Sequence, residues 1–432
     1  MFLADSHVPF IAADSLMIMF VQIAVLLLAA VALGLGAQRL GLPAVVGEIL
    51  AGVVLGPSLL GHFCPWLQAW IFPADAGQQN LVDAIGQLGV VLLVGLAGAE
   101  LDLAFVRRQA RVVSTVGLFA FVVPLGAGIA AGFVVPAVMH THQMSTTVLA
   151  LMLGTALSVS AIPVIAKVLT EMGLLHRNIG QLTLAVGSTN DALAWVLLSV
   201  TASMATVGLH TGDVVAAVLA TLGVIVVALV VIKPVLTPAL SRLESSASTA
   251  SLLGPMCAAI IVACAAATQA LHLEAILGAF LAGVAIGPRA PQLIAPLRIV
   301  TMTVLAPIFL ASAGLRVDLA LLGDPVVAVT AAALLALAVA TKFGGSYLGA
   351  RIAKRTRWEA VALGSGLNTR GAVEIVIAMT GLRLGVFSSS MYTVIVLIAI
   401  ATSVMAPPML RYAMNHIEAT DEERVRQALR EA

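Results

Sequence analysis

The sequence predicts an all-α polytopic membrane protein of about thirteen transmembrane helices. Three observations lead to this fold class: an apolar composition, basic residues that gather on one side of the predicted spans, and an internal repeat. Of the 432 residues, 61% are hydrophobic and only 10% are charged, and the mean hydropathy is +1.09. Because a soluble domain carries roughly 25% charged residues, we expect the lipid bilayer to surround most of the surface.

The composition also excludes several functions. The formal net charge of +1 comes from scattered basic residues that form no patch, so no nucleic-acid partner is expected. Cys64, Cys257 and Cys264 lack metal-ligand spacing and are interpreted as small apolar residues. An intramembrane enzyme would need paired midspan aspartates or His and Glu metal ligands, and the sequence shows no such set. We therefore expect neither an enzyme nor a bound cofactor.

A helix needs about 20 apolar residues to cross the hydrocarbon. Segments that meet this requirement lie near residues 15–38, 43–62, 84–101, 112–136, 146–171, 180–208, 213–240, 250–270, 273–288, 296–315, 326–350, 358–382 and 389–413.

The basic residues test this count independently, because cytoplasmic loops are enriched in Lys and Arg. With thirteen spans, 18 of the 22 basic residues fall on one side, namely Arg39, Arg107, Arg108, Arg111, Lys167, Arg177, Lys233, Arg242, Arg289, Arg298, Arg351, Lys354, Arg355, Arg357, Arg411, Arg424, Arg426 and Arg430. Arg316 and Arg383 fall on the other side, and Lys342 and Arg370 lie within spans. We expect the N-terminus outside and the C-terminus in the cytoplasm.

Two pairs of stretches in the two halves resemble each other. Residues 46–57 (VGEILAGVVLGP) resemble 277–288 (LGAFLAGVAIGP), and 96–104 (LAGAELDLA) resemble 311–320 (ASAGLRVDLA). The alternative is chance similarity of helices rich in Gly, Ala and Leu, but both matches occur in the same order. A displacement by seven spans inverts the second copy, which predicts inverted six-helix repeats, an architecture of many secondary transporters.

Asp191 is the sharpest candidate for a functional residue. It lies near mid-depth of the span at 180–208, where an ionisable residue is costly and so indicates function. A carboxylate there can bind either a proton or a monovalent cation, and competition between the two is sufficient for exchange. The alternative is a structural carboxylate. Asn190 would add an uncharged oxygen, or act as a helix–helix hydrogen-bonding residue.

Two spans at equivalent places in the halves carry signals of broken helices. Pro163 removes a helical hydrogen bond, and the hydroxyls of Thr155, Ser158 and Ser160 lie just upstream. Residues 364–374 (GSGLNTRGAVE) form the counterpart. Paired broken helices crossing in the core indicate a transport site near Asp191, although Pro163 could instead make a simple kink.

Three further charges lie within spans. Arg370 and Glu374 are four residues apart and can neutralise each other. Lys342 then needs a partner, for which Asp191 is the strongest candidate. The alternative is a lysine that stabilises an ion pair or binds backbone carbonyls.

Residues 157–164, 189–195 and 368–374 resemble the monovalent cation:proton antiporters, the sodium/hydrogen exchanger-like proteins. The similarity runs from Ser15 to about Tyr412 and is nearest to the branch of plant cation/H⁺ exchangers and bacterial potassium-efflux antiporters. It implies a homodimer in a bacterial inner (plasma) membrane with elevator-like alternating access. It also implies a cation- and proton-binding role for Asp191 with Asn190, and charge compensation by Lys342, Arg370 and Glu374.

Two details of the sequence depart from the family pattern. Asn190 beside Asp191 is linked with electroneutral members and Lys342 with electrogenic ones, so both stoichiometries stay open. Ile162 stands where many relatives carry Asp.

The resemblance also implies a division of the chain into three parts: an extracytoplasmic N-terminus (1–14), an exchanger domain (15–415), and a short cytoplasmic tail (416–432) without a nucleotide-binding regulatory domain. Within the exchanger domain we expect a dimer part (15–104 and 250–320), a transport part (112–208 and 326–415) and a linking helix (213–243).

The sequence therefore favours exchange of Na⁺ or K⁺ for H⁺, with the monovalent cation as the only metal, at Asp191. Two alternatives stay open. One is a cation-coupled symporter of a small organic solute, which would need a larger polar cavity. The other is an ion channel or sensor.

Overall fold

The computed structural model describes residues 12–73, 75–99, 109–141, 144–174, 176–207, 211–245, 250–271, 273–287, 291–421 and 423–424. Most of the predicted N-terminal segment and part of the predicted tail lie outside these residues. So do residues 100–104 and Pro288 of the repeat, together with the basic residues Arg107, Arg108, Arg289, Arg426 and Arg430.

The described residues confirm an all-α membrane fold, because they form helices and no strand. The longer helices are α1 (Ala13–Arg39), α2 (Ala44–Leu55), α5 (Ala76–Ala99), α7 (Ala110–Val134), α8 (Thr146–Ser158), α9 (Ile162–Glu171), α10 (Asn178–Val207), α11 (Thr211–Val226), α12 (Lys233–Ser245), α13 (Leu253–Ala270), α14 (Ala275–Ile286), α15 (Pro291–Val300), α16 (Ala306–Gly314), α17 (Pro325–Ile352), α18 (Arg357–Leu367), α19 (Ala372–Arg383) and α20 (Ser389–Met414). The shorter α3 (Leu60–Phe63) and α4 (Pro65–Ile71) follow α2.

Within the described chain, ten helical segments are long and apolar enough to cross a membrane. The other predicted spans contain shorter helices: α8 and α9 occupy 146–171, α14 occupies 273–288, and α18 and α19 occupy 358–382. The exact count of thirteen stays a prediction. Two π-helical segments, Val227–Ile232 and Thr301–Leu305, join α11 to α12 and α15 to α16.

Both predicted helix breaks are present in the backbone. The first lies between Ser158 and Ile162, so that Pro163 is the second residue of α9, where its missing N–H costs no helical bond. The second separates Leu367 from Ala372 and includes Gly371 at φ +153°, a conformation that residues with a Cβ rarely adopt. Each predicted span is therefore divided into two helices by a short non-helical segment.

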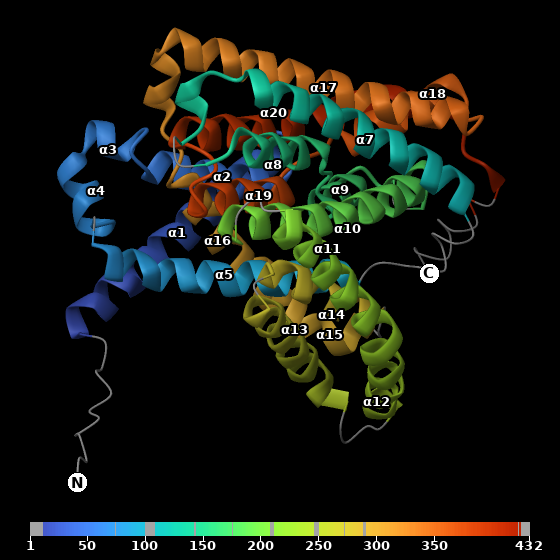
Figure 1. The fold of residues 1–432 in the computed structure, drawn as a ribbon, viewed down its shortest axis with the longest axis horizontal. Helices are drawn as coiled ribbons and strands as arrows, with labels where there is room; N and C mark the ends of the chain where they lie inside the picture. Colours follow the sequence, from blue (N-terminus) through green and yellow to red (C-terminus); the bar gives the residue numbers. More distant parts are fainter. Residues whose placement is uncertain are drawn as a thin grey trace.

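The helices pack in two groups. α1, α2, α5, α13, α14 and α16 contact one another and form what we call the first group. α7, α8, α10, α17, α18 and α20 form the second group, to which α9 and α19 are joined through α10, α8 and α20. Figure 1 shows α7, α17, α18 and α20 along one side and α5, α13, α14 and α15 along the other. The roles predicted for these parts, as dimer and transport parts, stay predictions.

Glycines of the repeated stretches permit two close helix crossings in the first group. A Cβ built at Gly52 of α2 would lie 1.9 Å from a backbone oxygen of α16, and one at Gly314 of α16 would lie 2.2 Å from a backbone oxygen of α2. Similarly, a Cβ at Gly283 of α14 would lie 2.0 Å from a backbone oxygen of α5, and one at Gly98 of α5 would lie 2.3 Å from one of α14. The inverted repeat itself stays a prediction.

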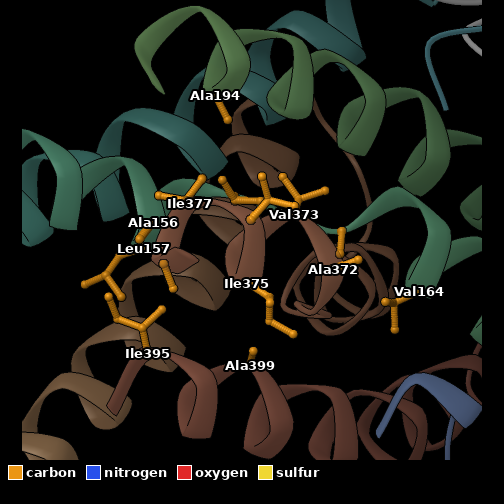
Figure 2. Packing of buried hydrophobic residues seen from close by; sticks show 14 of the residues in the cluster. Ala156, Leu157, Val164, Ala194, Ala372, Val373, Ile375, Ile377, Ile395 and Ala399 are labelled. Atoms are coloured by element: carbon orange, nitrogen blue, oxygen red, sulfur yellow. The ribbon is translucent and has the colours of Figure 1, made fainter. Parts of the chain in front are cut away.

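Buried apolar side chains surround the second broken helix. Figure 2 shows Ala156 and Leu157 of α8, Ala194 of α10, and Ile395 and Ala399 of α20 around α19, and each of these five residues is fully buried. This packing excludes water from the crossing, so polar groups there must find partners within the protein or in what it binds.

Replacement of Gly52 or Gly283 by Val is expected to destabilise the protein by about 3 kcal/mol or more, because the new side chain collides with backbone that cannot rotate away. The measurement is the thermal unfolding temperature in detergent. Gly126→Val is the matched control, since a Cβ there meets nothing within 4 Å. Equal unfolding temperatures for all three variants would contradict the role of the two crossings.

Candidate functional site

Asp191 lies at the amino end of the second half of the first broken helix. The residue is 1% exposed, and its Oδ2 accepts the backbone N–H of Ile162, the first residue of α9, at 3.2 Å. The free N–H groups and the dipole of a helix N-terminus favour an anion. Its other oxygen, Oδ1, is buried without a hydrogen-bond partner. The carboxylate therefore keeps acceptor capacity for a further ligand.

A cavity of about 10 Å³ adjoins Asp191 between the two helix groups. Asp191 and Trp195 of α10, Phe280 of α14, and residues of α5 and α19 line this cavity. This volume holds about one water-sized sphere. Asp191 thus faces the contact between the groups instead of the interior of either one.

Two cationic side chains satisfy the carboxyl end of α8. Arg370 donates to the Ala156 and Leu157 carbonyls at 3.2 and 2.6 Å, and Lys342 Nζ donates to the Ser158 carbonyl. The last carbonyls of a helix have no partner within it and carry the negative end of its dipole. Arg370 and Lys342 supply both the missing donors and the opposite charge.

Lys342 and Asp191 interact electrostatically, but they form no direct ion pair of the kind that was predicted. Lys342 is fully buried, but its ammonium group binds the Ser158 carbonyl, as in the carbonyl-binding alternative. Asp191 instead lies at the N-terminus of α9. The physical reason is that the two sides of one helix break have opposite polarity, so the break places the cation and the anion at different helix ends.

Arg370 and Glu374 form the ion pair that their spacing predicts. Arg370 Nη1 lies 3.1 Å from Glu374 Oε1, and both side chains are fully buried. Glu374 Oε2 has no hydrogen-bond partner, and Glu374 lies in the first turn of α19, where a carboxylate is favoured. The pair is therefore local to the second break, and its charge-compensating role stays a prediction.

The two broken helices contact each other at their breaks. Ala161 N donates to the Thr369 carbonyl at 3.2 Å, and Ser160 Oγ donates to the Leu367 carbonyl at 3.0 Å. These bonds satisfy backbone groups that the interrupted helices leave open. Because Asp191 binds the next residue, Ile162, the carboxylate lies beside this crossing.

The other predicted ligands have different surroundings. The hydroxyls of Thr155 and Ser158 donate to carbonyls of their own helix, at 2.7 and 2.8 Å. The side chain of Asn190 faces α7. If Gly117 of α7 carried a Cβ, that atom would lie 3.5 Å from Asn190 Oδ1. Successive residues of a helix point about 100° apart, so Asn190 does not share the cavity of Asp191. Its role as a ligand stays a prediction, and of Pro163 only the backbone is described.

Asn368 is a polar residue to which the sequence assigned no role. It lies in the second break, is fully buried, and has no partner for either atom of its amide. The amide of Asn190 is also buried and unpaired, and leaving such groups unsatisfied costs about 1–3 kcal/mol. The sequence signal that could have identified Asn368 is its position as a polar residue within a Gly-rich stretch of a predicted span. The crossing therefore carries unused hydrogen-bonding capacity.

A second and larger cavity opens at the predicted cytoplasmic face. It measures about 300 Å³ and lies between Gln38 and Gly41 at the end of α1, Met172 just after α9, and residues of α20 that include Arg411. Met172 is ten residues beyond Ile162, which corresponds to roughly 15 Å of helix. The cavity thus lies between the two groups on the predicted cytoplasmic side of Asp191.

Residues 23–415 match the family model described as "Sodium/hydrogen exchanger, transmembrane". The chain belongs to this family. It is a multi-pass integral membrane protein, and its candidate site occupies the crossing of the two broken helices within the matched region.

Several characterised proteins are similar over most of the chain. The Na⁺/H⁺ antiporter NhaS4 of Synechocystis is 31% identical over 405 residues, covering 92% of this chain and 97% of the relative. The Na⁺/H⁺-K⁺ antiporter GerN of Bacillus cereus is 28% identical, with coverage of 92% and 96%. The K⁺/H⁺ antiporter 1 of Saccharomyces cerevisiae is 28% identical over 85% of this chain, which spans 43% of the yeast protein.

The fold is similar to a solved structure. The sodium/proton antiporter MjNhaP1 of Methanocaldococcus jannaschii, at pH 8, superposes with a TM-score of 0.66 over 93% of this chain and 99% of the other. The sequences are 14% identical, so this likeness concerns the fold alone.

Replacement of Arg370 by Gln is expected to destabilise the protein by about 3–5 kcal/mol, because it leaves Glu374 and two α8 carbonyls buried without a donor. Thermal unfolding in detergent measures the effect. Arg370→Gln/Glu374→Gln should recover part of the loss, since neither member of this buried pair is then left charged without its partner. Arg355→Gln, which breaks a partly exposed pair with Glu359, is the control and should shift stability by less than about 1 kcal/mol. A small effect of Arg370→Gln would contradict the interpretation.

Proposed function

We propose that the protein is a secondary active antiporter that exchanges a monovalent cation, Na⁺ or K⁺, for H⁺ by alternating access. The observation that carries the proposal is Asp191, a buried carboxylate with an unpaired oxygen on the cavity between the helix groups. The relatives named as Na⁺/H⁺, Na⁺/H⁺-K⁺ and K⁺/H⁺ antiporters support the same class of function. Because their names differ in the ion, both cations are retained.

The chemistry of Asp191 supports competition between the two ions. A carboxylate in a water-excluded site must be neutralised, and either a proton or a cation can do so. A single carboxylate carries one negative charge, so it binds either the proton or the cation at one time. The nearby fixed charges form no direct ion pair with Asp191, because the ammonium group of Lys342 binds the Ser158 carbonyl and Arg370 binds Glu374 and α8. Asp191 therefore stays available to the transported ions.

The cavities support an inward-facing arrangement. The space at Asp191 is about 10 Å³, whereas the cytoplasmic crevice between the groups is about 300 Å³. A movement of the second group against the first would transfer Asp191 from one face to the other. The small volume at Asp191 favours a bare ion over an organic solute, and therefore favours antiport of cations over the symport alternative.

The remaining features of the proposal are those that the resemblance to the family implies. We propose a homodimer in the plasma membrane of a bacterium, with the C-terminus in the cytoplasm. We further propose transport without a bound cofactor, in which Lys342 contributes to the stoichiometry. The thirteen-span topology with N-terminus outside belongs to the same proposal.

Asp191→Asn is expected to abolish exchange, because the amide has the same shape but carries no negative charge and takes up no proton at neutral pH, so it cannot trade a proton for a cation. The measurement is cation-induced dissipation of a pH gradient in proteoliposomes, comparing Na⁺, K⁺, Li⁺ and Rb⁺. Asp324→Asn is the matched control: Asp324 caps α17 through Val326 N, a bond that Asn also makes. Exchange that survives unchanged in Asp191→Asn would refute the central assignment.

Lys342→Gln is expected to alter the dependence of exchange on membrane potential, because it removes a buried charge from the group proposed to move. The assay is run with and without an imposed potential, on wild type and variant. An unaltered potential dependence would exclude a role of Lys342 in stoichiometry. Thermal unfolding of the same sample separates this effect from a loss of structure, since Gln can still donate to the Ser158 carbonyl.

A further inference from the structure

Glu274 and Arg383 form an ion pair that joins the two helix groups. Glu274 immediately precedes α14 of the first group, and Arg383 is the last residue of α19, which packs with the second. Arg383 Nη2 donates to both carboxylate oxygens of Glu274, at 3.3 and 3.2 Å. The Glu274 side chain is 9% exposed and that of Arg383 is 50% exposed. The carboxylate is thus largely shielded from water, and the cation reaches it from the predicted outer face.

The carboxylate serves the neighbouring group and not its own helix. Glu274 occupies the N-cap position of α14 but makes no side-chain cap bond there. A carboxylate at that position is favoured by the helix dipole and commonly accepts an N–H of the first turn. The carboxylate accepts from Arg383 instead.

The pair lies directly outside the cavity of Asp191. Phe280 of α14 and Val376 of α19 both line that cavity. Glu274 precedes Phe280 by six residues and Arg383 follows Val376 by seven, which corresponds to roughly 9 and 10 Å of helix. Two of the helices that line the cavity, α14 and α19, are therefore connected at their predicted outer ends.

The contact between the groups is asymmetric. At the outer face the Glu274–Arg383 pair joins them, together with the bond from Tyr392 Oη of α20 to the Ala313 carbonyl of α16 at 2.6 Å. At the predicted cytoplasmic face the crevice of about 300 Å³ separates them. An opening of the outer face requires α19 to leave α14, which breaks the ion pair.

We propose that Glu274 and Arg383 form an outer gate, a contact that stabilises the inward-facing arrangement and breaks when Asp191 faces outward. The proposal rests on the proposed function, because only alternating access requires the two faces to open in turn. Removal of either charge shifts the population toward the outward-facing arrangement, and a covalent link between the two positions prevents exchange.

The chain supplies a matched control at the same face. Arg316 forms an ion pair with Asp83 of α5, and both residues belong to the first group. Breaking this pair removes no ion pair between the two groups, although both charges act electrostatically on Tyr392 of α20. Asp83→Asn therefore reports the effect of losing an outer ion pair without opening the gate.

Labelling of a reporter cysteine from outside tests the gate. Ala97, on the α5 wall of the Asp191 cavity, is replaced by Cys in a variant in which Cys64, Cys257 and Cys264 are Ala. A membrane-impermeant thiol reagent is added outside, and the labelling rate is measured. We expect Arg383→Gln and Glu274→Gln to raise the rate roughly fivefold, Arg383→Lys to stay near the parent rate, and Asp83→Asn to leave it unchanged. Equal rates for all variants would overturn the gate.

Cross-linking distinguishes failure of the gate from failure of the function. Glu274→Cys/Arg383→Cys is prepared in the same cysteine-free background and treated with a short, reducible bifunctional thiol reagent. The gate predicts loss of cation/H⁺ exchange, restored by reduction. Full exchange in the cross-linked protein would overturn the gate and leave the function standing. No exchange in the wild type would overturn the proposed function, and the labelling rates would still decide whether the pair controls outer access.

Discussion

The need to satisfy the backbone at a broken helix determines the arrangement of charge in this protein. Within the membrane, water does not complete the hydrogen bonds of an interrupted helix. The carboxyl end of α8 therefore takes donors from Arg370 and Lys342, two residues far away in the chain. The amino end of α9 presents N–H groups, one of which binds Asp191. One break thus fixes the places of two cations and one anion.

This arrangement explains why Asp191 is available for ions. If Lys342 paired directly with it, a transported cation would have to displace an ammonium group from a desolvated site. Instead Lys342 is committed to a carbonyl and Arg370 to Glu374 and α8. Asp191 retains an unpaired oxygen on the cavity between the groups. The fixed charges support the crossing, while the remaining carboxylate faces the contact at which access must change.

The first group is closely packed within itself, and an ion pair links it to α19. Glycine crossings hold α2 to α16 and α5 to α14 at distances that admit no side chain, so the first group is suited to act as a rigid body. Its link to α19 through Glu274 and Arg383 is partly exposed to solvent. Exposed ion pairs are worth little compared with buried packing. A rigid part joined to its neighbour by a weak contact is the mechanical basis of the proposed gate.

The sequence by itself determined the membrane fold class, the helical segments, the two breaks and the buried charges, because hydropathy and the cost of charge in lipid act locally along the chain. The Arg370–Glu374 pair was also predictable, since both residues lie on one helical turn or next to it. Only the tertiary structure decided that Lys342 binds the Ser158 carbonyl, that Asn190 faces α7, and that Glu274 meets Arg383. These contacts join residues tens to hundreds of positions apart, and no local pattern specifies which helix end or helix face will lie opposite a given side chain.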